Sequence, residues 1–247
     1  MDVFLIAGQS NSEGHGESGG PPVPDGMAFA YFNGALTSGN DPVGNANPGS
    51  AWPAFMRTYV ERTSRRVTVV PAAIGGTGQC SKVVASHGSW DDDGELWARS
   101  VGLLREAVAK LRESGADPAF RGILWSQGEA DSYGILHGNE TAADYEAALM
   151  RMIVRYRNVP FIGPAMPFYI FRTGANSAGA GDFFAPVRDA QERVAARDAQ
   201  TIIVFRGAAD FPARGMMRSG EHALHYNQAG LDLMGREGAE WVIAALA

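Results

Sequence analysis

A serine stands where the first apolar run of the chain ends, at a place suited to a nucleophile. Residues 3–7 predict a buried strand, and the tetrapeptide GQSN follows it directly at 8–11. With glycine two residues before it, a serine at a strand end can expose its hydroxyl above the sheet. Its own backbone N–H can then point at a developing oxyanion. This placement suits either a nucleophile for acyl transfer or a serine that caps a helix or sits in a turn.

Two further segments after predicted strands carry groups that such a site can use. The strand predicted at 66–74 ends at Gly75 and Gly76, and glycine lets a backbone amide approach a ligand with no side chain in the way. The strand predicted at 123–126 is followed by Gln127, whose amide can donate an N–H, and by the carboxylate of Glu129. We expect these groups to meet Ser10 if their strands lie side by side.

Apolar runs alternate with segments of helical period along the whole chain. Strands are predicted at 3–7, 66–74, 123–126, 160–166 and 201–205. Helices are predicted at 50–63, 95–114, 182–198 and 227–246, with one more beginning at the capping pair Thr141 and Asp144. This order predicts a mostly parallel sheet covered on both faces, a single-domain three-layer α/β/α sandwich over residues 1–247. Ligands of such folds bind beyond the carboxyl ends of the strands.

Four segments resemble, in order, the motifs of SGNH hydrolases of the sialate O-acetylesterase and carbohydrate esterase family 6 type. They read GQSN at 8–11, IGGT at 74–77, WSQGEAD at 125–131 and HYNQAG at 225–230. A less specific match, PVRDAQ, lies at 186–191. The GxSxG elbow of α/β-hydrolases is absent around Ser10. The resemblance runs from Phe4 to about Gly238 and implies the SGNH, flavodoxin-like form of the sandwich.

The resemblance also implies an activity, a serine esterase that removes acetyl groups from a carbohydrate. Ser10 would be the nucleophile and His225 its base, rather than His222, because only His225 has the YNxxG context. The oxyanion hole would combine the Ser10 amide, the amide of either Gly75 or Gly76, and the side chain of Gln127. Gln9 and Trp90 are the predicted substrate contacts, Trp90 by stacking on a sugar. This mechanism needs no metal or organic cofactor, and sialic acid, xylan and other acetylated glycans all fit it.

The third member of a catalytic triad is not where the resemblance would put it. Many relatives carry an aspartate three residues before the catalytic histidine, and this chain has His222 there. Glu129 is the first candidate for the carboxylate that orients His225, and Glu221 is the second. A main-chain carbonyl, leaving a Ser–His dyad, is the third.

Composition narrows the range of partners. The net charge is −6, with 27 acidic and 21 basic residues, so a nucleic acid is not an expected partner. No basic run favours an anionic membrane, and no stretch approaches the roughly 20 apolar residues of a membrane span. Cys80 is the single cysteine, which excludes an intrachain disulfide. The expected compartment is the cytoplasm as the sequence stands, or an exported location if a leader was removed; the oligomeric state is not indicated.

Two other functions stay open at this point. One is an esterase for simple, non-sugar esters. The other is a carbohydrate-binding module that keeps the fold without catalysis, an idea that rests on the unusual His222. Turnover of p-nitrophenyl acetate separates an esterase from such a module.

Overall fold

The computed structural model describes residues 1–247 apart from 92, 177–180 and 221–222. In this part of the chain the strands form one seven-stranded sheet in the order β3-β2-β4-β1-β5-β6-β7. All neighbours are parallel except the hairpin of β2 and β3. The strands are β1 (Asp2–Gly8), β2 (Ala28–Phe32), β3 (Ala35–Ser38), β4 (Val67–Pro71), β5 (Ala119–Ser126), β6 (Phe168–Phe171) and β7 (Thr201–Phe205).

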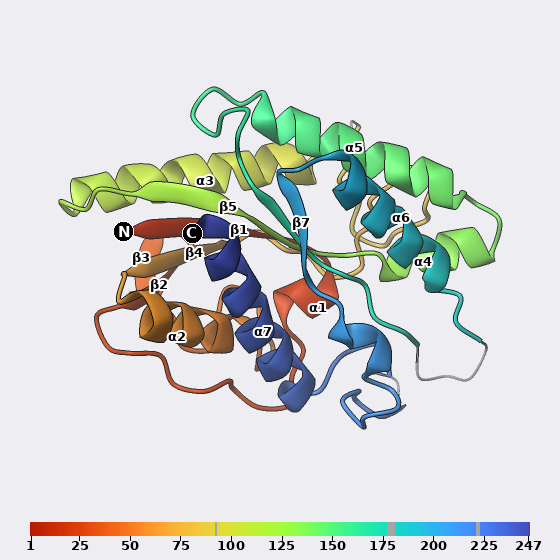
Figure 1. The fold of residues 1–247 in the computed structure, drawn as a ribbon, viewed down its shortest axis with the longest axis horizontal. Helices are drawn as coiled ribbons and strands as arrows, with labels where there is room; N and C mark the ends of the chain where they lie inside the picture. The colour runs from red at the N-terminus through yellow and green to blue at the C-terminus, as the bar shows by residue number, and fades with distance from the viewer. Residues whose placement is uncertain (92, 177–180, 221–222) are drawn as a thin grey trace.

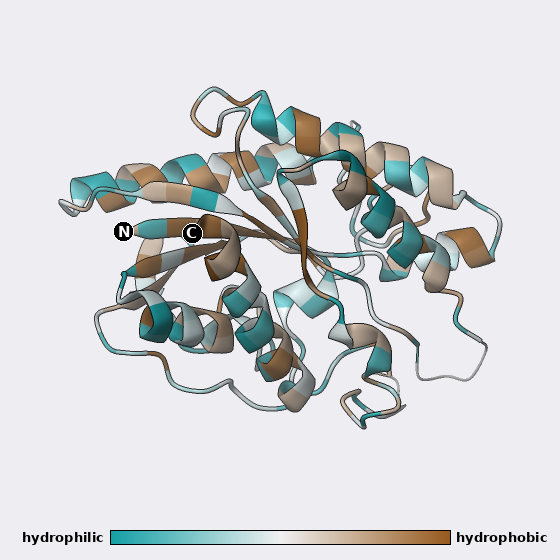
Figure 2. Ribbon diagram, in the orientation of Figure 1, coloured by the Kyte–Doolittle hydropathy of each residue, from teal (hydrophilic) through white to brown (hydrophobic). Residues whose placement is uncertain are grey.

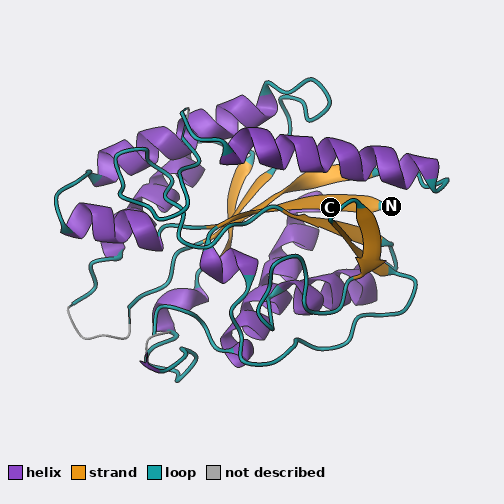
Figure 3. Ribbon diagram, turned by 180° about the vertical axis from the view of Figure 1, so that it is seen from behind, coloured by secondary structure: helices purple, strands orange, loops and turns teal. Residues whose placement is uncertain are grey.

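Helices cover both faces of this sheet, which confirms the predicted three-layer sandwich (Figures 1 and 3). One face carries α2 and α7, and the other carries α3, α5 and α6. The helices are α1 (Ser10–Glu13), α2 (Trp52–Thr63), α3 (Leu96–Glu113), α4 (Glu129–Leu136), α5 (Ala142–Arg157), α6 (Ala185–Arg197) and α7 (Gln228–Leu246), with a 3-10 turn, η1 (Gly207–Asp210). None of the described helices is long and apolar enough to cross a bilayer.

The central strand β1 shows why the strand sequences are almost wholly apolar. Phe4 packs toward α2, where its ring meets Phe55 and Tyr59 edge to face, while Leu5 packs into the opposite core beside Leu104. Every residue of β1 is buried, and the strands are the most hydrophobic part of the ribbon (Figure 2). A strand covered on both faces cannot alternate polar with apolar residues.

One prediction of secondary structure is corrected by the structure. The strand predicted at 160–166 is wrong: the chain turns there and the strand is β6, at Phe168–Phe171. Pro160 and Pro164 lack the N–H that a ladder needs, and Gly163 has φ +85°. The structure also has two elements that the sequence did not predict, the helix α4 and the hairpin of β2 and β3.

The topology brings three chain segments to one edge of the sheet. β1 lies between β4 and β5, and all three run parallel, so their carboxyl ends point the same way. The chain leaves β1 toward one side of the sheet and returns to the other side with β5. This is a topological switch point, where open α/β sheets bind their ligands.

Candidate active site

A cavity of about 660 Å³ lies at this edge of the sheet. The segments that follow β1, β4 and β5 line it, together with the segment that leads into α7. Its lining comprises Gln9, Ser10, Glu13, His15, Asn45, Ile74, Gly75, Gly76, Ser86, His87, Glu129, Ala130, Tyr133, Leu224 and His225. The structure thus brings the serine, the glycine pair, the predicted acid and the predicted base to one place.

The turn that carries Ser10 is set by Gly8, the last residue of β1. Gly8 has φ +127°, and a Cβ there would lie 2.0 Å from the carbonyl oxygen of Ser126 on β5. Only glycine allows this close approach, and it directs the chain straight into α1. Ser10 is the first residue of α1, so its amide has no partner inside the helix. That free N–H is what an oxyanion-hole donor requires.

Asn11 connects the turn that carries Ser10 to the segment that bears His225. Its Nδ2 donates to Glu129 Oε1 at 2.6 Å and to the carbonyl oxygen of Leu224 at 3.2 Å. Its Oδ1 accepts the backbone N–H of Tyr226 at 3.0 Å. The peptides on both sides of His225 are therefore held by one buried side chain, which fixes where the imidazole can lie.

Glu129 is linked to the histidine segment through Asn11, whose side-chain amide donates to Glu129 Oε1. A direct contact between Glu129 and His225 stays a prediction. Burial raises the pKa of Glu129, and the Asn11 bond opposes that rise. The other two predicted neighbours, Glu221 and His222, lie outside the described residues.

Ser10 and His225 both line the cavity. A hydrogen bond between Ser10 Oγ and the imidazole of His225 stays a prediction. Catalytic hydrogen bonds are commonly long in the absence of substrate and tighten when it binds. The ring of His15 stacks on that of His225, with centroids 4.4 Å apart and planes 10° from parallel. The stacked ring limits how far the imidazole of His225 can turn.

Of the two candidate glycines, Gly75 is the one beside the serine. A Cβ on Gly75 would lie 3.6 Å from Ser10 Cβ, whereas one on Gly76 would lie 2.3 Å from Ser86 Oγ, in the neighbouring loop. Gly76 also has φ +67°, so its role is to turn the chain. The amide of Gly75 donates to Glu13 Oε2 at 2.9 Å. The candidate oxyanion donor is thus held by a carboxylate from α1.

Gln127 occupies a different place from the one predicted for an oxyanion donor. Its side chain is fully buried and is not part of the cavity lining. Its Nε2 donates to Gln9 Oε1, to the carbonyl oxygen of Thr77 and to Asp131. Gln9 Oε1 also accepts the amides of Gly128 and Ala130. These bonds fasten the nucleophile turn to the segment after β5, and Gln9 remains at the cavity wall.

The predicted contact between Trp90 and a sugar is corrected by the structure. Trp90 has no exposed surface, packs edge to face on Trp125 and donates its indole N–H to Thr77 Oγ1. The aromatic ring at the cavity wall is Tyr133 on α4, which contacts Phe183 with ring centroids 4.9 Å apart. Tyr133 therefore presents its ring to the cavity, whereas Trp90 is buried in the core.

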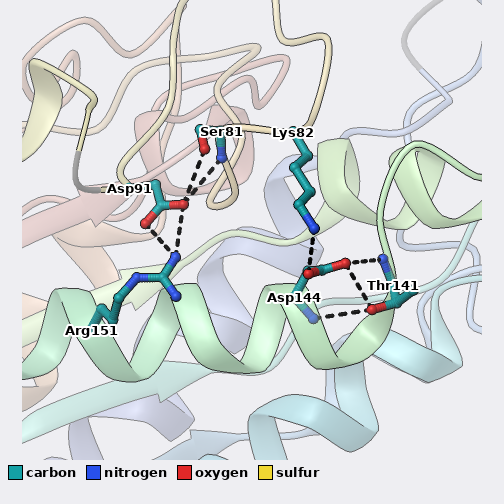
Figure 4. A network of polar contacts seen from close by, with 6 residues as sticks. All are labelled: Ser81, Lys82, Asp91, Thr141, Asp144 and Arg151. Carbon is teal, nitrogen blue, oxygen red and sulfur yellow. Dashed lines mark hydrogen bonds and ion pairs between the residues drawn. The ribbon is translucent and has the colours of Figure 1, made fainter.

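The loop that carries the two glycines is fastened to α5 by ion pairs (Figure 4). Arg151 on α5 makes two hydrogen bonds to Asp91, which also accepts the hydroxyl and amide of Ser81. Lys82 pairs with Asp144, the residue that closes the capping box at the start of α5. The middle of the loop and the part that leads into α3 are thus attached to α5.

Several residues of the site were not assigned a role from the sequence. Asn11 belongs to the GQSN motif, but its bonds depend on loops that are far away in sequence. Glu13 and His15 lie just after that motif, and spacing alone gives no sign that they face the cavity. No group of three or more histidine, cysteine, aspartate or glutamate side chains placed to hold a metal is found in the part of the chain that is described.

The fold and this site define a hydrolase of the SGNH type. Residues 1–244 match the family described as "Carbohydrate esterase, sialic acid-specific acetylesterase", so the chain belongs to that family. Its membership explains why the four motifs stand in this order, and it supports carbohydrate esterase activity in general.

Solved structures share the fold at low sequence identity. A protein of Arabidopsis thaliana has a TM-score of 0.74 and 21% identity, with 98% of each chain covered. NanS has a TM-score of 0.63 and 17% identity over 99% of this chain and 96% of its own. A carbohydrate acetylesterase from Xanthomonas citri has a TM-score of 0.58 and 17% identity over 99% of this chain and 55% of its own. A search of curated proteins finds no match.

Proposed function

We propose that this protein is a carbohydrate O-acetylesterase that works through an acetyl-enzyme on Ser10. The observation that supports the proposal most is the meeting of Ser10, the Gly75 amide and His225 in one cavity at the switch point of the sheet. The family supports a carbohydrate as the substrate. The sugar and the acetylated position are open.

The reaction begins when His225 takes the proton of the Ser10 hydroxyl as that oxygen attacks the acetyl carbonyl carbon. The amides of Ser10 and Gly75 donate to the oxyanion of the tetrahedral intermediate, each donor contributing about 3 kcal/mol. His225 then gives its proton to the sugar oxygen as the ester bond breaks. Water, deprotonated by His225, releases acetate and restores Ser10.

Two residues support this chemistry without touching the reacting atoms. Asn11 holds the peptides on both sides of His225, and Glu129 holds Asn11. Glu129 is therefore proposed as a positioning residue. The sugar would rest against Tyr133 at the cavity wall, since an aromatic face suits the apolar face of a pyranose.

Acetate release from a panel of acetylated glycans, measured for the wild type and Ser10→Ala, tests the proposal. The wild type should release acetate from at least one glycan, and the variant should retain less than about a hundredth of that rate while folding normally. Circular dichroism and the melting temperature serve as the folding control. Equal rates for the two proteins, or no turnover of any ester by the wild type, would refute the proposal.

A further inference from the structure

The cavity wall that α4 forms continues outward past the cavity. Ala130 and Tyr133, both on α4, line the cavity. His137 ends this helix four residues after Tyr133, so the two side chains lie on the same side of α4. His137 is exposed and is not part of the lining. The cavity-facing residues of α4 are therefore the inner part of a row that leads from the cavity to the surface.

Three aromatic rings meet along this row. The rings of His137 and Tyr133 are nearly parallel, with centroids 6.3 Å apart and planes at 20°. Phe183, in the segment before α6, contacts the Tyr133 ring with centroids 4.9 Å apart and planes at 63°. We call His137, Tyr133 and Phe183 the aromatic platform. Only Tyr133 lines the cavity, so the platform extends beyond the cavity wall.

The aromatic platform keeps part of its surface open. Tyr133 and Phe183 are half-buried and His137 is exposed, whereas Phe184 is buried. The ring of Phe184 packs edge to face on both Tyr133 and Phe183, so it supports the platform from the core. Contiguous apolar surface at the rim of a cavity is typical of a ligand-binding site, whereas single exposed apolar side chains are not. The open surface of the rings is therefore available to a ligand that extends out of the cavity.

Polar contacts hold the aromatic platform in place. The hydroxyl of Tyr133 accepts Asn176 Nδ2 at 3.2 Å. Arg188 on α6 is buried, donates Nη1 to the carbonyl oxygen of Gly174 at 2.6 Å, and pairs with Asp182, the residue before the phenylalanine of the platform. A surface that is already in place gives up little conformational freedom when a ligand binds.

We propose that the aromatic platform binds a second sugar, the one that is glycosidically linked to the acetylated sugar in the cavity. The preferred substrate is then an acetylated residue within an oligosaccharide or polysaccharide, and not a free monosaccharide. This inference rests on the proposed esterase function and names the form of its substrate. The C–H groups on the face of a pyranose suit the negative face of an aromatic ring. A linked sialic acid and a neutral acetylated sugar within a chain both fit the proposal.

Pairs of substrates that share one acetyl group at one position, and differ in the attached sugar, test this directly. One pair is O-acetylated N-acetylneuraminic acid and O-acetylated sialyllactose. The other is an O-acetylated methyl xyloside and the correspondingly acetylated xylotriose. The same comparison is made for any further glycan that the acetate-release panel identifies. The linked member of a pair that is turned over should have a kcat/KM at least about fivefold higher, mostly through a lower KM.

Two variants of the aromatic platform should reduce this preference. Phe183→Ala should lower the ratio of linked to free kcat/KM by at least about threefold, and His137→Ala should lower it in the same direction. His137 is exposed at the end of α4, so its variant keeps the test valid if Phe183→Ala does not fold. The matched control is Phe161→Ala, which removes a ring that is 40% exposed, packed under Arg105 and not part of the cavity lining. It should leave the ratio as in the wild type.

The outcomes separate the two claims. Equal kcat/KM for the linked and free members of every pair that the wild type turns over overturns the inference, while the esterase function stands. The same holds if both platform variants keep the wild-type ratio, or if Phe161→Ala lowers it equally. Failure of the wild type to hydrolyse any of these sugar acetates, the glycan panel or p-nitrophenyl acetate overturns the proposed function itself.

Discussion

The substitution Glu129→Gln distinguishes a carboxylate that acts on His225 directly from one that acts through Asn11. In the structure Glu129 Oε1 accepts Asn11 Nδ2 at 2.6 Å, in a setting where Glu129 is buried. A glutamine carbonyl at the same place can accept the same bond. We therefore expect kcat/KM to fall by less than about tenfold.

The magnitude follows from the kind of bond that is lost. Exchanging an ionised acceptor for a neutral one weakens a bond whose net contribution is about 1.5–3 kcal/mol, without removing it. Loss of a carboxylate that stabilises the imidazolium directly can cost up to about 10⁴ in turnover. Asn11→Asp differs, because it replaces the donor to Glu129 with an oxygen and sets two carboxyl groups together in a buried place. We expect this variant to lose at least about a hundredfold in kcat/KM.

The double variant Asn11→Asp with Glu129→Gln completes the test. The introduced glutamine amide can now donate to the introduced carboxylate, so the bond is restored with its polarity reversed. The other oxygen of that carboxylate can still accept the amide of Tyr226. Steady-state hydrolysis of p-nitrophenyl acetate should show the double variant recovering at least tenfold over Asn11→Asp. A loss above about 10³ in Glu129→Gln alone, or no recovery in the double variant, refutes the indirect role.

Two further predictions concern Glu140 and Tyr133. Burial, with Asp131 nearby, raises the pKa of Glu140 to about 9, so between about pH 4.5 and 9 the folded protein keeps a proton that the unfolded chain loses. The stability that this group contributes is lost as pH rises through this range. Since the linkage amounts to about 1.4 kcal/mol for each pH unit, Glu140→Gln should gain on the order of 5 kcal/mol in unfolding free energy over the wild type between pH 5 and pH 9 in urea unfolding, and a pH-independent difference would contradict this. Tyr133→Ala should raise KM for a sugar acetate at least threefold with little change for p-nitrophenyl acetate; an equal effect on both esters would remove Tyr133 from sugar contact.

The sequence predicted the helices and strands that have a clear local pattern better than the segments between them. The strand at Thr201–Phe205 and the capping box of Thr141 and Asp144 agree with prediction, because both follow from local pattern. The hairpin of β2 and β3 does have a local signal in the sequence: Asn33 and Gly34, with φ +49° and +80°, form the tight turn that Asn-Gly favours. The strand at 160–166 was misplaced because its apolar content outweighed its prolines and glycine.

The motifs predicted which segments meet, but not which way each side chain faces. Ser10, Gly75 and His225 reach the cavity as expected because the ends of parallel strands share an edge. Trp90 and Gln127 follow strands too, yet both side chains turn inward and are buried. Whether a side chain faces the cavity or the core depends on packing against residues that are distant in sequence. The local pattern of a single sequence does not encode that packing.

The most direct test of the account is to find the acetyl group on the enzyme. The wild type is mixed with a sugar acetate that it turns over, quenched in acid within the first turnovers and digested, and the peptides are examined by mass spectrometry. The account predicts one added acetyl group on Ser10 that disappears once substrate is exhausted. An acetyl group trapped on another residue, or steady acetate release by Ser10→Ala, would contradict it.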